Sequence, residues 1–99
     1  MKVAWARRAR RDLSDIGRYI RRDNPNAART WVARLFKRAE LIGLSPLGGR
    51  VVPELDRSDV REVFERTYRI IYQVRKGSIL VLAVLEGHHL LRNTDIDDV

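Results

Sequence analysis

The chain has 99 residues, 44% of them hydrophobic, which suits a single domain with an apolar core and excludes a disordered chain. Its 20 Lys and Arg residues against 13 Asp and Glu give a net charge of +7, which predicts an acidic partner such as a nucleic acid or an acidic protein. The chain contains no cysteine, which excludes disulfides, thiol catalysis and cysteine metal sites.

The N-terminal half predicts a short strand over residues 2–6 and then two amphipathic helices. In residues 7–23, apolar side chains recur at helical spacing between charged ones. Asn24 can accept hydrogen bonds from the first turn of a second helix, and Pro25 suits the first position of that helix. Residues 43–49, rich in glycine, end it, so the two helices form an antiparallel hairpin. The residues expected to be buried together in this hairpin are Leu13, Ile16, Ile20, Trp31, Val32 and Leu35.

The C-terminal half predicts three consecutive antiparallel strands, over residues 60–65, 68–75 and 78–86. A loop over residues 48–59 precedes them, and a tight turn at residues 75–78 joins the last two strands. We expect residues 88–99 to be a flexible acidic tail of a single domain, 1–99. The predicted fold class is α+β, with an N-terminal strand and a helical hairpin packed on an antiparallel sheet that holds the three C-terminal strands.

The last two strands predict a sheet that is apolar on both faces. Pairing across the tight turn collects on one face Ile70, Tyr72, Val74, Ile79, Val81, Ala83 and Leu85. The second face then holds Arg69, Ile71, Gln73, Arg75, Leu80, Leu82, Val84 and Glu86. Because two helices can cover only one face, we expect a partner chain to cover the second. The alternative is a sheet twisted enough to shelter that face within the monomer.

Few residues suggest catalysis, and we expect neither a cofactor nor a metal, since no nucleophile elbow, phosphate loop or dinucleotide motif is present. His88 and His89 are adjacent and would point to opposite faces of a strand, which argues against a shared metal ion. Either could act as a general acid or base, or simply end a solvated strand. Seven arginines on the first helix suit a solvated face, and their excess over nearby acids supports contact with phosphates or an acidic peptide. No signal peptide or membrane-spanning run is visible, so we expect a cytoplasmic protein without a membrane partner.

Several short motifs follow one another along the chain in an informative order. They are Arg11-Asp12-Leu13, Tyr19-Ile20, Asp23-Asn24-Pro25, Pro46-Leu47-Gly48-Gly49-Arg50, Val52-Pro53-Glu54, Arg61-Glu62-Val63 and Tyr68-Arg69-Ile70-Ile71-Tyr72. Together they resemble the ParE/RelE superfamily of toxins from bacterial type II toxin–antitoxin pairs, and its ParE branch most. The resemblance implies the fold described above, inhibition of DNA gyrase without enzymatic activity, and a cognate antitoxin whose C-terminal segment wraps the toxin.

The resemblance also supplies a partner for the second sheet face. We expect an antitoxin segment that folds on binding to cover its apolar residues, with bordering arginines paired to acidic side chains of that segment. The predicted antitoxin-binding residues are Arg69, Ile71, Arg75, Leu80, Leu82 and Val84.

An alternative function, also implied by the resemblance, is ribosome-dependent mRNA cleavage, as in RelE-like relatives. Arg61 and Arg69 resemble positions where such endoribonucleases place arginine, and His88 or His89 would carry the proton. The two arginines could instead form salt bridges with neighbouring glutamates. The loop over residues 49–59 lacks the lysines common in these enzymes, and no tyrosine follows the last strand, so we assign no catalytic residue.

A third possibility is an antitoxin-binding module with little toxicity. Many ParE relatives carry a histidine-glycine-arginine-arginine stretch after the last strand. This chain has Glu86-Gly87-His88-His89 there, so the basic end of that pattern is missing.

Overall fold

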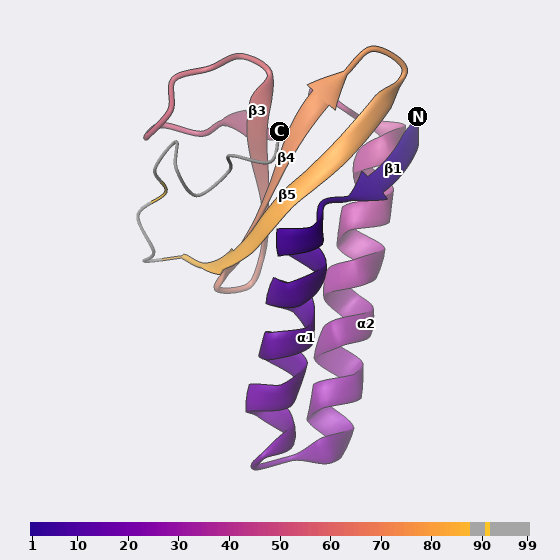
Figure 1. The fold of residues 1–99 in the computed structure, drawn as a ribbon, viewed down its shortest axis with the longest axis vertical. Helices are drawn as coiled ribbons and strands as arrows, with labels where there is room; N and C mark the ends of the chain where they lie inside the picture. Colours follow the sequence, from indigo (N-terminus) through magenta and orange to yellow (C-terminus); the bar gives the residue numbers. More distant parts are fainter. Residues whose placement is uncertain (88–90, 92–99) are drawn as a thin grey trace.

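The structure is a computed structural model that describes residues 1–87 and 91, and Figure 1 shows a sheet with a long helical hairpin beside it. The elements in chain order are β1 (Lys2–Trp5), α1 (Arg7–Arg21), α2 (Pro25–Leu41), the 3-10 turn η1 (Ile42–Leu44), β2 (Arg50–Val51), β3 (Val60–Glu65), β4 (Tyr68–Arg75) and β5 (Ser78–Glu86). The sheet has five strands in the order β1-β5-β4-β3-β2. The predicted α+β class is confirmed. Of the expected tail, residues 88–99, only Leu91 lies within the described residues.

The sheet contains the three predicted C-terminal strands and two further strands at its edges. β4 lies between β3 and β5 and is antiparallel to both. β1 runs parallel to β5, with Lys2 opposite Ser78, and so extends the predicted antiparallel sheet into a mixed one. The chain between these two parallel strands runs through the helical hairpin and then through β2, β3 and β4. At the other edge, the two-residue strand β2 forms within the predicted loop and pairs with β3.

The helical hairpin forms as its local sequence predicts. Asn24 accepts a hydrogen bond from the backbone N–H of Ala27 at 3.1 Å, and Pro25 occupies the first helical position. The two helices approach closely at Gly17, where a Cβ atom would lie 2.8 Å from a methyl group of Val32. Figure 1 shows the turn between α1 and α2 projecting well beyond the sheet. Among the described residues, no helix is long and apolar enough to cross a membrane.

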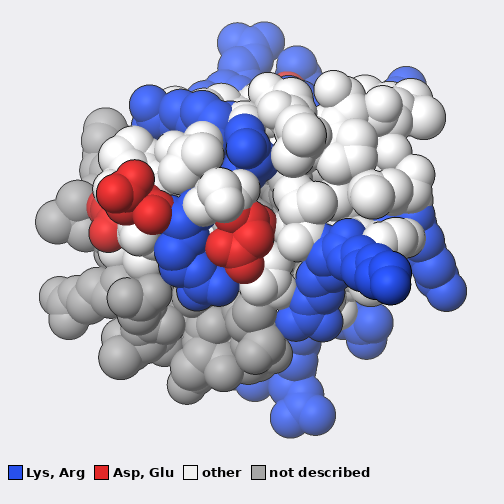
Figure 2. Space-filling view, turned by 90° about the horizontal axis from the view of Figure 1, so that it is seen from above, with Lys and Arg blue, Asp and Glu red and all other residues white. Residues whose placement is uncertain are grey.

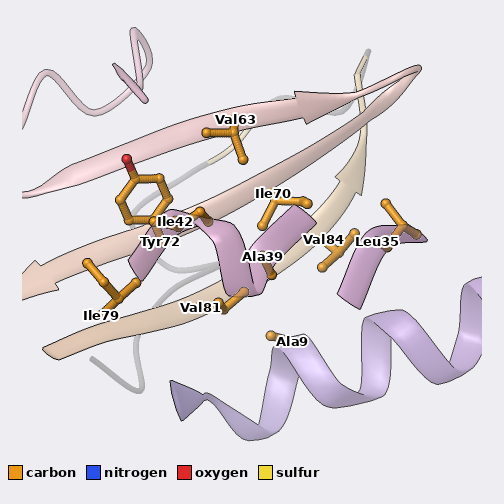
Figure 3. Packing of buried hydrophobic residues seen from close by; sticks show 10 residues of the cluster. All are labelled: Ala9, Leu35, Ala39, Ile42, Val63, Ile70, Tyr72, Ile79, Val81 and Val84. Atoms are coloured by element: carbon orange, nitrogen blue, oxygen red, sulfur yellow. The ribbon is translucent and has the colours of Figure 1, made fainter. Parts of the chain in front are cut away.

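The core between the sheet and the hairpin is formed by side chains of both helices, η1 and the three central strands, as Figure 3 shows. Its buried members are Ala9, Leu35, Ala39, Ile42, Val63, Ile70, Tyr72, Ile79, Val81 and Val84. Of the residues expected to be buried together in the hairpin, only Leu35 is fully buried. The other five are partly exposed: Leu13, Ile16, Ile20, Trp31 and Val32. The reason is that the sheet does not reach the projecting end of the hairpin, so side chains there pack on one side only.

The hydroxyl of Tyr72 connects the turn after α2 to the sheet through hydrogen bonds. It donates to the carbonyl of Pro46 at 2.8 Å and accepts from the backbone N–H of Gly49 at 3.0 Å. A Cβ atom at position 49 would lie 2.5 Å from the same hydroxyl, so this close approach requires glycine. The turn therefore has a fixed position against β4, although Leu44 and Leu47 beside it are largely exposed.

A β-bulge in β5 corrects the predicted faces of this strand. Tyr72 pairs with Val81 and Ile71 pairs with Ala83, so Leu82 is an extra residue with no partner on β4. Beyond the bulge the alternation is reversed, and Val84 packs in the core under the helices. The prediction that placed Val84 on the second face, and Ala83 and Leu85 on the first, is therefore wrong.

The bulge also gives α1 a polar attachment to the sheet. The backbone N–H of Val84, which lies beyond the end of β1, donates to the carboxylate of Asp12 at 2.9 Å. Partial burial raises the pKa of Asp12, while this hydrogen bond and the neighbouring Arg8 act in the opposite direction. β1 therefore borders the N-terminal part of β5, and α1 borders the part beyond the bulge.

Replacing Leu35 should reveal how much the core contributes to stability. Leu35→Ala should lower the free energy of unfolding by about 2–5 kcal/mol, because the side chain fills a fully buried site. Leu44→Ala is a matched control, since Leu44 is 83% exposed and its truncation should change stability by less than about 0.5 kcal/mol. Denaturant titration measures both effects. Equal midpoints for Leu35→Ala and the wild type would contradict the assignment of Leu35 to the core.

Candidate partner-binding site

The second face of the sheet is organised around a buried carboxylate. Glu62 on β3 is 1% exposed and accepts hydrogen bonds from Arg69 on β4, at 2.6 Å, and from Arg50 on β2. The two terminal nitrogens of Arg69 donate to the carboxylate of Glu54 at 2.7 and 3.1 Å. We call these four residues the Arg69 cluster. It joins three strands and the loop between β2 and β3 through charge-assisted hydrogen bonds.

The arginines of the Arg69 cluster compensate the burial of its carboxylates. A buried carboxylate is costly unless it is paired and hydrogen-bonded, and Glu62 has an arginine on each of its oxygens. The hydrogen bonds from Arg69, with a further one from the backbone N–H of Leu91, outweigh desolvation and lower the pKa of Glu54 to about 2. The loop that carries Glu54 is therefore held against the sheet.

This loop covers the face that was expected to need a partner. Val52, Leu55 and Leu91 pack against the second-face cluster, which includes Ile71 and Leu82. Ile71 is fully buried and Leu82 is 2% exposed. The expectation of an uncovered second face is therefore wrong, because the loop and Leu91 shelter it within the chain.

The six residues predicted to bind an antitoxin consequently do not form one open patch. Val84 lies on the other face, Arg69 is bound to two glutamates, and Ile71 and Leu82 are buried. Two residues retain accessible surface: Leu80 is partly exposed, and Arg75 is exposed and donates to Gln73 at 2.7 Å. Binding of an antitoxin here stays a prediction.

The candidate catalytic arginines are both engaged in structural contacts. Arg69 forms salt bridges with Glu54 and Glu62, the second of which was anticipated as the alternative to catalysis. Arg61 donates to the backbone carbonyls of Ser58, at 3.1 Å, and Gly49, at 3.0 Å, and so connects the loop before β3 to the residue that precedes β2. The other two candidates, His88 and His89, lie outside the described residues.

An open groove runs along the helical hairpin, with a volume of about 1070 Å³. Its apolar lining comes from both helices: Leu13, Gly17, Pro25, Ala28, Val32 and Ala33. Trp5 and Phe36 also line it, with their rings stacked at a centroid distance of 5.7 Å. Ser14 and four arginines complete the lining; the arginines are Arg10, Arg18 and Arg21 from α1 and Arg29 from α2. We call this surface the hairpin groove.

Sequence reasoning missed the hairpin groove because its lining resembles a core. Leu13 and Val32 have the helical spacing of buried residues, and they were predicted to be buried. The available signal was the small residues Gly17 and Ala28, which add little side-chain bulk to this surface.

The charge of the surface agrees with an acidic partner. Figure 2 views the molecule from the end opposite the hairpin turn, where basic side chains surround a broad uncharged area and the few acidic ones lie near basic ones. This end of the molecule therefore carries basic side chains in addition to those along α1. Such a field attracts polyanions and acidic proteins.

Comparison with known proteins identifies the family. Residues 3–91 match the model of the family described as "ParE toxin of type II toxin-antitoxin system, parDE". A protein of Sinorhizobium fredii (strain NBRC 101917 / NGR234) named "Putative toxin Y4kP" is 30% identical over 92 residues, which cover 88% of each chain. The fold is similar to a chain of the solved structure titled "Chromosomal ParDE TA system from P. aeruginosa", with a TM-score of 0.75, 21% identity, and coverage of 87% of this chain and 95% of that one.

The fold and the match over nearly the whole chain define a small toxin-like protein with a helical hairpin on a mixed sheet. The chain belongs to the ParE toxin family of type II toxin–antitoxin systems. The ParE resemblance seen in the sequence is confirmed.

The Arg69 cluster predicts a defined pH dependence of stability. The pKa of Glu54 lies at about 2 in the folded protein, below its ordinary value of 4.5, so its ionised form stabilises the fold above pH 4.5 and this contribution is lost as the pH falls toward 2. Glu54→Gln should therefore be less stable than the wild type near neutral pH, and the difference should shrink toward pH 2. Urea unfolding at several pH values measures it. A constant difference across that range would contradict the ion pair.

Proposed function

We propose that this protein is the toxin of a type II pair, that it inhibits DNA gyrase, and that a cognate antitoxin neutralises it. Membership of the ParE toxin family and the likeness to a chain from a structure titled as a ParDE system support this proposal. Gyrase inhibition is the activity that the ParE resemblance in the sequence implies.

The observation that favours gyrase over mRNA cleavage is the state of the two candidate arginines. Cleavage needs cations free to stabilise a phosphorane and a group to move the 2′-hydroxyl proton. Arg69 is 4% exposed and its charge is balanced by two carboxylates, so a phosphate would have to displace Glu54 or Glu62 to reach it. Arg61 already donates to two backbone carbonyls.

A pair of assays tests the proposed target. The purified toxin should inhibit supercoiling of relaxed plasmid by purified gyrase, and prior mixing with its antitoxin should relieve the inhibition. Primer extension on ribosome-bound mRNA should give no new cuts. Cuts that vanish with Arg61→Ala would instead assign the protein to the nucleases. No effect in either assay would favour an antitoxin-binding module with little toxicity.

The hairpin groove is our proposed docking site for the antitoxin, in place of the sheet face. Its apolar lining offers burial to one side of an amphipathic segment, and its four arginines suit acidic side chains beside that apolar side. The indole N–H of Trp5, which lines the groove, is buried and has no acceptor among the described residues.

Two charge changes at exposed positions distinguish the groove from the sheet face. Ala33→Glu should weaken antitoxin binding by about 10- to 100-fold, because it fills the groove and repels an acidic segment. Arg75→Glu, beside the second sheet face, should change affinity by less than about threefold, as expected of a charge outside the interface. Isothermal titration with the antitoxin measures both, and circular dichroism checks folding. The reverse result would restore the sheet face as the docking site.

A further inference from the structure

The solvent side of α1 and its C-terminal cap residue, Arg22, carry the same arrangement of arginines twice. Arg7, Arg10 and Arg11 form a first triad, and Arg18, Arg21 and Arg22 form a second, each member eleven residues further along. Eleven residues are close to three helical turns, so the second triad lies almost directly beyond the first on the same side of the helix. All six side chains are exposed. We call this surface the arginine stripe.

The arginines of the stripe have few partners of their own. Within residues 1–87 and 91, the only carboxylate that forms a salt bridge with any of the six is Asp15, 3.7 Å from Arg18, and both members of that pair are more than half exposed. Arg18 also donates to Ser14 at 3.4 Å. An exposed pair of this kind contributes little and leaves the guanidinium group available to a ligand.

The positions of the first triad oppose the stability of the helix. No acidic residue lies in the first turn of α1, and the preceding Ala6 offers no side-chain cap. Cations are unfavourable at a helix N-terminus, and like charges four residues apart, such as Arg7 and Arg11, repel each other. A bound anion would relieve both effects, because helix N-termini favour phosphate and the ligand would neutralise the neighbouring charges.

The chemistry of the stripe selects a phosphate backbone. Ser14 lies on this side between the two triads, and Asp15 lies at its border beside Arg18, so the surface offers charged and polar groups and no apolar or aromatic contact. An amphipathic peptide needs apolar contact, and single-stranded bases need stacking platforms. A duplex presents only phosphates and sugars along its outer edge, which such a surface can bind.

The spacing of the two triads suits B-form DNA. Eleven residues of α-helix span about 16 Å, somewhat more than the roughly 12 Å width of the major groove. One triad can therefore contact the phosphates on each side of that groove. A-form RNA has a deep, narrow major groove, whose phosphates do not match this separation.

We propose that the arginine stripe of α1 binds the phosphate backbone of duplex DNA, with one triad on each strand across the major groove. This activity goes beyond the proposed inhibition of gyrase and does not depend on it. Arg10, Arg18 and Arg21 also line the hairpin groove, whereas Arg7, Arg11 and Arg22 belong to the stripe alone. The second set therefore tests the proposal without altering the groove.

Fluorescence anisotropy with a short labelled DNA duplex and the full-length toxin, free of gyrase, tests the proposal. Six phosphate contacts predict that log K falls with log salt at a slope of about −5 between roughly 50 and 200 mM salt. Replacing Arg7, Arg11 and Arg22 with Gln should reduce the magnitude of the slope by about 2 to 3 and weaken binding at least tenfold at low salt. Circular dichroism confirms that the variant is folded.

A matched control removes three cations elsewhere. Lys2, Arg75 and Lys76 are exposed where β1 meets the turn between β4 and β5, outside the stripe, and their replacement by Gln should leave the slope nearly unchanged. An equal loss in this control would mean that net charge alone binds DNA and would overturn the proposal. Equal affinity for a double-stranded RNA or for single-stranded DNA would also overturn it. So would a stripe variant that keeps its DNA affinity but loses antitoxin affinity, since the partner would then be an acidic protein.

Discussion

The carboxylate of Glu62, buried in the sheet, is the constraint from which the rest of the second face follows. A charge in that position must be paired, and the sequence supplies Arg69 from the next strand and Arg50 from the edge strand. Arg69 also forms a salt bridge with Glu54, and this contact places the loop between β2 and β3 over the sheet. The same loop brings Val52 and Leu55 onto the apolar residues beneath it. The chain thus covers both faces of its sheet, and the helical hairpin is left as its open surface.

The elements of this fold can be read from the sequence, but the side of the sheet on which each residue lies cannot. Periodicity gave the strand bounds, and Asn24 with Pro25 gave the hairpin turn. The bulge at Leu82 could not be predicted from the sequence, because the neighbouring residues are all apolar and an extra residue leaves no break in the alternation of apolar and polar positions. The hairpin groove could not be predicted either, because it depends on how far the helices project past the sheet, which is a property of the assembled fold. The basic character of α1 was visible from composition alone.

α1 has three different sides, and each has its own chemistry. Ala9 lies in the core, Leu13 and Gly17 line the hairpin groove, and the arginine stripe faces the solvent. The groove and the stripe share Arg10, Arg18 and Arg21, which stand on the border between them. In our proposals, an antitoxin in the groove and a DNA duplex on the stripe would therefore both contact these three arginines. Binding of one would weaken binding of the other through shared charge, without any change in the fold.

The pairing of β1 with β5 has a consequence for the order in which the protein can be assembled. β1 is the first element to be synthesised, yet among the described residues it pairs in the sheet only with the last strand, β5. Lys2 can therefore pair with Ser78 only after almost all of the described chain has been made. The hairpin groove, by contrast, is formed by residues 5–36, a single continuous stretch. During synthesis from the N-terminus, the hairpin leaves the ribosome well before the strand that completes the sheet. The groove that we propose for the antitoxin and the complete fold are therefore separated in time by the translation of about half the chain.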